Sequence, residues 1–97
     1  MNPQDCNTLA EIRGNIDQID REIIGMLAKR YGFVQKAAEF KKDEAGVKAV
    51  DRVKDMLKTR RIWAEEENIS PDLIEKIYAN LVSCFIQEEL NNWKTKR

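Results

Sequence analysis

Three cationic residues in the first half of the sequence, Arg13, Arg30 and Lys41, are the best candidates for a binding site. Arg30 falls on a row of apolar residues, where a charged side chain must be paired or must face a polar cavity. On a helix, Lys41 would lie within about 20° of the same face and roughly 16 Å further along. Arg13 would lie about 25 Å from Arg30 and about 100° around the helix, so it could join them only from a second copy. Converging cations predict a small ligand with two carboxylates.

A carboxylate near the C-terminus could complete this site. Glu88 and Glu89 follow an apolar run, and the pattern does not choose between them. The sequence contains no histidine, so the commonest general base and metal ligand are missing. We therefore expect a reaction driven by orientation and electrostatic stabilisation, with no cofactor and no metal. In the alternative, structural interpretation, Arg30 pairs with a buried glutamate, and Lys41 and the two glutamates lie in solvent at helix ends.

The composition limits the classes of partner. The 97-residue chain is expected to form one domain, residues 1–97. Lys+Arg and Asp+Glu both number 17, so there is no net charge to attract nucleic acid or a membrane surface. The sequence shows neither a membrane-spanning apolar stretch nor a secretory signal. Cys6 and Cys84 fit neither a disulfide framework nor a metal site, so we expect a cytoplasmic protein with two reduced thiols.

A long amphipathic helix must carry all three cations. Thr8 and Glu11 have the spacing of a capping box at its start. Apolar residues then recur in steps of three and four along one face: Ile12, Ile16, Ile19, Ile23, Met26, Phe33, Ala37 and Phe40. A helix from Leu9 to Lys42 would be about 51 Å long, whereas a compact domain of this size is about 30 Å across. One chain would leave part of this face exposed, which predicts a two-fold homodimer with a shared core.

Two further helices are expected after a polar segment. Residues 42–48 lose the helical period and are expected to form a mobile loop. The second helix is expected to begin with Asp51 as its N-cap and to end near Asn68. The Ser-Pro pair at 70–71 marks the start of the third helix, which is expected to run to about Trp93. The pattern predicts an all-α fold with three helices in each chain.

Several short segments resemble a known family. Four of them, along the expected first helix, are similar to the helical chorismate mutase family: residues 9–13, 16–20, 27–30 and 37–41. Three more resemble its isochorismate-pyruvate lyase branch: residues 5–6, 51–53 and 63–93. The resemblance covers nearly the whole chain, and it implies an intertwined homodimer of three-helix chains with two equivalent sites.

The resemblance also implies a role for each candidate residue. Arg13 would reach across from the partner chain to one substrate carboxylate, and Arg30 would bind the other. Lys41 would hydrogen-bond a carboxylate and the ether oxygen of an enolpyruvyl group. Arg52 would support the carboxylate end, and Glu89, rather than its neighbour, would face the ether oxygen from the opposite side. Lys41 and Glu89 are thus the implied catalytic residues.

The sequence departs from the family pattern at two positions. Many relatives have Gln where Glu89 stands, and an ionised Glu89 would repel the ether oxygen. We therefore expect Glu89 to be protonated during turnover, since removal from water disfavours its charged form, and we expect an acid-shifted pH optimum. Mutases of the family usually place a Glu at the position of Val53, where it contacts the chorismate hydroxyl. An apolar residue there favours isochorismate as the substrate.

The resemblance therefore implies an isochorismate-pyruvate lyase. It would form salicylate and pyruvate in a cofactor-free pericyclic reaction, with weak chorismate mutase activity beside it. Salicylate used in siderophore synthesis is the implied pathway. Two alternatives stay open. One is a chorismate mutase that makes prephenate, which Val53 disfavours. The other is a non-enzymatic helical dimerisation module, in which the cations only form salt bridges.

Overall fold

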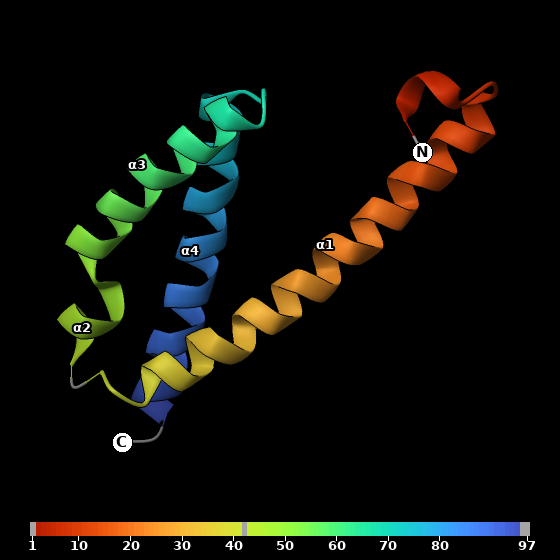
Figure 1. The fold of residues 1–97 in the computed structure, drawn as a ribbon. Coiled ribbons are helices and arrows are strands. Elements are labelled where there is room, and N and C mark those ends of the chain that lie inside the picture. The colour runs from red at the N-terminus through yellow and green to blue at the C-terminus, as the bar shows by residue number, and fades with distance from the viewer. Residues whose placement is uncertain (1, 42, 96–97) are drawn as a thin grey trace. The chain divides into compact units, whose positions relative to one another are not determined.

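The computed structural model of the chain describes residues 2–41 and 43–95. They form a short 3-10 helix and α-helices of very different lengths: η1 (Pro3–Asp5), α1 (Leu9–Ala38), α2 (Glu44–Lys48), α3 (Val50–Glu66) and α4 (Pro71–Thr95) (Figure 1). The described residues include no strand. The predicted all-α fold with three main helices is therefore confirmed, and α2 is an addition to it.

The chain divides into two compact units, the N-terminal unit (Met1–Gln35) and the C-terminal unit (Lys36–Arg97). The N-terminal unit consists of η1 and most of α1, whereas the C-terminal unit contains α2, α3 and α4. The organisation of residues 1–97 as one domain stays a prediction.

The start of α1 agrees with the capping pattern of the sequence. The Glu11 backbone N–H donates to Thr8 Oγ1 at 3.1 Å, and the Glu11 carboxylate accepts the backbone N–H of Asn7 at 3.0 Å. The helix ends at Ala38 rather than at the expected Lys42. Tight three-residue turns replace its last turn, because the Lys41 N–H donates to the Ala38 carbonyl at 3.2 Å. With 30 residues, α1 is about 45 Å long.

None of the side chains of α1 is buried. Its apolar face forms a continuous exposed row, here called the α1 stripe, in which each side chain is 41–62% exposed: Ile12, Ile16, Ile19, Ile23 and Met26. Helices in proteins gain most of their stability from tertiary packing of such a face. The N-terminal unit by itself lacks that packing.

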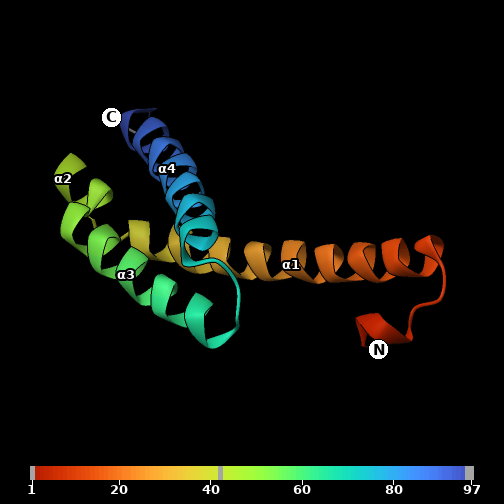
Figure 2. The same cartoon turned by 90° about the horizontal axis from the view of Figure 1, so that it is seen from above.

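The core of the C-terminal unit lies between α3 and α4, which run side by side as an antiparallel pair (Figures 1 and 2). Its buried side chains come from both helices: Met56, Ala64, Val82 and Leu90. The Arg60 guanidinium lies 4.6 Å from the ring centre of Trp63, on the same helix, and 5.6 Å from that of Tyr78 on α4. The cation–π contact with Tyr78 therefore joins α3 to α4.

The turn between α3 and α4 was predicted from local signals, and the structure confirms it. Asn68 has a positive φ of 57°, and its N–H donates to the Glu65 carbonyl at 3.2 Å. The Ile69 N–H donates to the Ala64 carbonyl at 3.0 Å, which completes a Schellman motif. Ser70 Oγ then accepts the Leu73 N–H at 3.2 Å and caps α4.

An ion pair spans the same turn. Arg61 Nη1 lies 2.8 Å from Asp72 Oδ1 and 3.7 Å from Glu75 Oε1. The hydrogen bond that Arg61 donates to Asp72 raises the pKa of Arg61 above its usual value, and the charges of Asp72 and Glu75 add to this effect. The pair links the last turns of α3 to the first turns of α4.

The structure corrects two expectations for the segment before α3. Residues 44–48 form the helix α2 instead of a loop, because Asp43 caps them, with its Oδ1 accepting the Gly46 N–H at 2.8 Å. Position 42 lies outside the described residues. The N-cap of α3 is Ala49 in a left-handed conformation (φ 41°), not Asp51. Asp51 lies in the first turn instead, where the helix dipole favours a carboxylate.

Candidate active site

Lys41 and Glu89 form an ion pair within the C-terminal unit. Lys41 Nζ lies 2.9 Å from Glu89 Oε2, and the two side chains are 23% and 12% exposed. Lys41 lies beyond the end of α1, so the prediction that it shares a helix face with Arg30 is wrong. Glu89 lies on α4 directly before the buried Leu90. Water screens a half-buried pair less than it screens an exposed one, so this contact is stronger than a surface salt bridge.

The contact distinguishes the two neighbouring glutamates that the apolar pattern could not separate. Glu88 is exposed, whereas Glu89 is half-buried and meets Lys41. The structure thus pairs Glu89 with Lys41, and the role of each in catalysis stays a prediction. A cation and a carboxyl group that face each other can act on one oxygen atom placed between them, if the carboxyl group is protonated.

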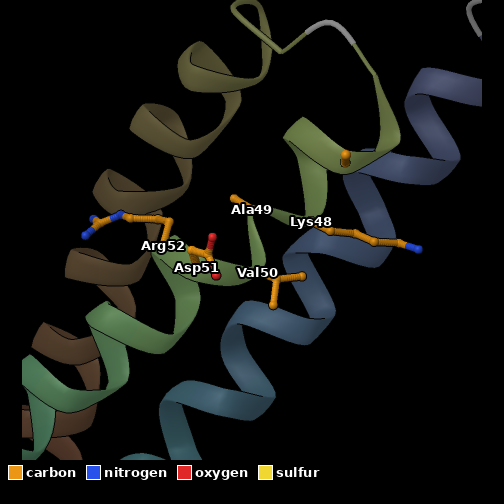
Figure 3. Close-up of a pocket in the computed structure, with 6 residues that line it drawn as sticks. Lys48, Ala49, Val50, Asp51 and Arg52 are labelled. Carbon is orange, nitrogen blue, oxygen red and sulfur yellow. The ribbon is translucent and has the colours of Figure 1, made fainter.

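Arg52 and Val53 lie at the start of α3. Val53 is half-buried and Arg52 is exposed. Arg52 lines a cavity of about 530 Å³ at the junction of α2 and α3, together with residues 45 and 48–51 (Figure 3). The charged ends of Arg52 and Lys48 point away from each other in this cavity, and its lining includes neither Lys41 nor Glu89 (Figure 3). The ion pair, rather than this cavity, is therefore the candidate site.

Arg13 and Arg30 belong to the N-terminal unit. Arg13 is exposed and Arg30 is half-buried on α1. By the helical period, Arg30 continues the α1 stripe toward the end of α1. That these two arginines converge with Lys41 on one ligand stays a prediction.

Two residues beside Lys41 were not predicted from the sequence, because both belong to the segment expected to be a loop. Asp43 caps α2, and a Cβ atom built at Gly46 would lie 3.7 Å from Lys41 Cβ. An aspartate that precedes a short helical segment was the available signal, because Asp is a preferred N-cap residue.

Comparison with known proteins identifies the family. The family model "Chorismate mutase type II" matches residues 12–90. The chain belongs to this family. The match extends from α1 to α4, and the family identified from the sequence is confirmed. This places the chain in a family of enzymes and weighs against the dimerisation module.

Two curated relatives from this comparison differ in how much of their length the chain covers. Isochorismate pyruvate lyase of Pseudomonas aeruginosa is 38% identical over 95 residues, which are 98% of this chain and 94% of that protein. The T-protein of Haemophilus influenzae is 39% identical over 70 residues, which are 71% of this chain but 19% of that protein. The full-length match is therefore with the lyase.

In the part of the chain that the structure describes, no helix has the length and apolar character needed to cross a membrane.

Proposed function

We propose that this protein is an isochorismate-pyruvate lyase. The observation that carries the proposal is the contact between Lys41 and Glu89 at 2.9 Å, which pairs a half-buried cation with a half-buried carboxyl group. The relative named isochorismate pyruvate lyase supports the choice of reaction, because it matches 98% of this chain. The apolar Val53 on α3 also favours isochorismate.

The proposed reaction converts isochorismate into salicylate and pyruvate. One ring hydrogen moves to the methylene carbon of the enolpyruvyl group while the C–O bond between ring and ether oxygen breaks. The ether oxygen leaves as the carbonyl oxygen of pyruvate, and the ring becomes aromatic. The atoms balance without water, an oxidant or a reductant. Negative charge grows on the ether oxygen during this step, and the Lys41 ammonium would stabilise it.

Glu89 would bind the same ether oxygen from the opposite side. The oxygen can enter between the two groups only when the ion pair opens. A protonated Glu89 then donates a hydrogen bond, whereas an ionised Glu89 would repel the growing negative charge. The active form in this proposal carries a proton on Glu89, so activity should be highest at acidic pH.

The remaining cations would bind the two substrate carboxylates in a homodimer with shared sites. Arg30 would bind one carboxylate, Arg13 of the second copy would bind the other, and Arg52 would support the carboxylate end. The exposed α1 stripe supports a second copy, because monomeric proteins rarely leave a long apolar row uncovered. A cytoplasmic location is part of the proposal, as expected from a sequence in which Cys6 and Cys84 fit neither a disulfide framework nor a metal site.

The second candidate function is that of a chorismate mutase, which the description of the matching family favours. The same cations would bind chorismate and stabilise its rearrangement to prephenate. Val53 is the feature against this function, because it offers no carboxylate to the chorismate hydroxyl. We expect mutase activity as the weaker of the two reactions.

The deciding experiment is to incubate the pure protein with isochorismate and with chorismate separately, at about pH 5 and about pH 7.5, and to identify the products by chromatography. Salicylate and pyruvate from isochorismate as the faster reaction would support the lyase. Faster formation of prephenate from chorismate would make the protein a mutase. Turnover of neither substrate at either pH would contradict both functions.

A further inference from the structure

We infer that Asp43 and Gly46 are positioning residues, which hold the backbone of Lys41 so that its ammonium group reaches the site. The inference rests on the proposed role of Lys41 and adds to it. Asp43 bonds to Gly46, and Gly46 lies next to Lys41, so both would act through Lys41.

The first turn of α2 lies directly against Lys41. Asp43 Oδ1 accepts the Gly46 N–H at 2.8 Å, which fixes the start of the helix. A Cβ atom added at Gly46 would lie 3.3 Å from Asp43 Oδ1, 3.7 Å from Lys41 Cβ and 3.9 Å from Lys41 Cα. A side chain at position 46 would therefore point toward the Asp43 carboxylate and the base of the Lys41 side chain.

Lys41 thus has a neighbour near each end of its side chain. A Cβ atom at position 46 would be in van der Waals range of its Cα and Cβ, while its Nζ lies 2.9 Å from Glu89. Helix α2 also contacts α4, the helix that carries Glu89. The base of the lysine and its partner carboxylate are thus fixed to the same packed structure, which defines the direction in which the ammonium points.

Glycine at position 46 suits a place where other atoms lie close to the backbone. Gly46 does not have a positive φ, so its backbone does not require glycine. Glycine is also among the least favourable residues in a helix. The other glycines of the chain lie in α1, and there an added Cβ would meet nothing within 4 Å: Gly14, Gly25 and Gly32. Gly46 alone among the four meets its neighbours so closely.

The variant Gly46→Ala separates positioning from simple stabilisation of α2. If α2 only stabilises the fold, alanine improves the helix and leaves kcat unchanged. If Gly46 positions Lys41, the added methyl group shifts the Asp43 carboxylate, which would lie 3.3 Å away, and the cap next to Lys41 moves with it. We then expect kcat to fall about threefold to tenfold with a smaller change in KM. Ala45→Ser is the matched control, because it adds one atom to an exposed neighbour in the same turn and should leave kcat unchanged. An unchanged kcat in Gly46→Ala would overturn the inference.

Three variants at Asp43 test the N-cap of α2 without adding a side chain at position 46. Asp43→Ala removes the acceptor for the Gly46 N–H, so we expect a similar loss of kcat. Asp43→Asn and Asp43→Ser keep a capping oxygen and should restore most of the activity. Equal losses in all three variants would contradict a positioning role for the cap.

A readout without substrate keeps this inference separate from the proposed function. The coupling between Lys41 and Glu89 is measured from the Tm shifts of Lys41→Met, Glu89→Gln and the double variant, as the difference between the shift of the double variant and the sum of the two single shifts. The measurement is made once with Gly46 and once with Gly46→Ala. We expect the coupling to be largely lost with Gly46→Ala, and an unchanged coupling would overturn the inference. If wild-type protein turns over neither substrate while the coupling is lost, the proposed function fails and the positioning of Lys41 stands.

Discussion

The two units of the chain differ sharply in how they cover their apolar side chains. The C-terminal unit has its own core, in which Met56 and Leu90 are only 5% and 7% exposed. In the N-terminal unit, by contrast, Ile19 and Met26 on the α1 stripe are 54% and 62% exposed. One unit thus folds around its own contacts, whereas the other presents a helix whose apolar face needs a further surface.

The proposed function divides along the same boundary. The C-terminal unit contains the contact between Lys41 and Glu89, the groups assigned to the ether oxygen. The N-terminal unit contributes Arg13 and Arg30, the groups assigned to the substrate carboxylates. In this proposal the C-terminal unit supplies the groups that act on the ether oxygen. The N-terminal unit supplies the arginines that bind the carboxylates, one of them from the second copy.

The largest effect on activity is expected when Arg13 and Lys41 are removed from two different chains and the chains are then mixed. Arg13→Ala and Lys41→Ala should each lower kcat/KM by about 10²–10³, because each removes a charge from the site. When the two variants are mixed and allowed to exchange subunits, each mixed dimer contains one intact site. Activity in a standard turnover assay should then return to about a quarter of the wild-type value.

The control for this mixing experiment uses two residues of the same unit. Lys41→Ala mixed with Glu89→Ala should show no recovery, because one chain supplies both residues to one site. Recovery in the control, or none with the Arg13 variant, would contradict the shared site.

The second prediction tests whether a second copy of the chain covers the α1 stripe. Ile19→Glu places a charge in the middle of the stripe, so we expect the dimer to dissociate and cooperative unfolding to be lost. Light scattering after size exclusion and thermal unfolding followed by circular dichroism measure both. Arg21→Glu is the control, since it lies about 200° further around the helix and should stay dimeric. A dimeric, stable Ile19→Glu protein would show that the stripe is not the interface.

The third effect compares one side chain from each unit. Leu90→Ala removes a buried side chain and should lower the free energy of unfolding by about 2–4 kcal/mol. Met26→Ala should cost about as much if a second copy covers the α1 stripe, and less than about 1 kcal/mol if the stripe stays in water. Denaturant titration of both variants distinguishes these outcomes.

The smallest effect concerns the protonation of Glu89. An ionised Glu89 could not donate the proposed hydrogen bond, whereas the amide of Glu89→Gln keeps a donor at every pH. Wild-type kcat should therefore decrease toward alkaline pH, and a pH series of kcat should show a smaller decrease for Glu89→Gln. A wild-type rate that is undiminished well above pH 8 would contradict a protonated Glu89.

Local signals in the sequence were sufficient for most helix boundaries. Thr8, Asn68 and Ser70 were identified correctly because each bonds to backbone groups only a few residues away. The helix boundaries that were predicted wrongly lie on either side of α2. Ala49 adopts a left-handed conformation that nothing in its side chain indicates, and three-residue turns after Ala38 end α1 before its apolar pattern does.

The sequence by itself determined the all-α fold, because apolar periodicity and capping depend on neighbours within one or two helical turns. It also identified Lys41 as a candidate, but by a helical period that does not hold there, because α1 ends at Ala38 and Lys41 lies beyond it. Only the tertiary structure showed that Lys41 meets Glu89, which is 48 residues away, and that Gly46 lies next to Lys41. Such contacts depend on how helices pack against one another, and the spacing of residues along a single helix does not contain that information.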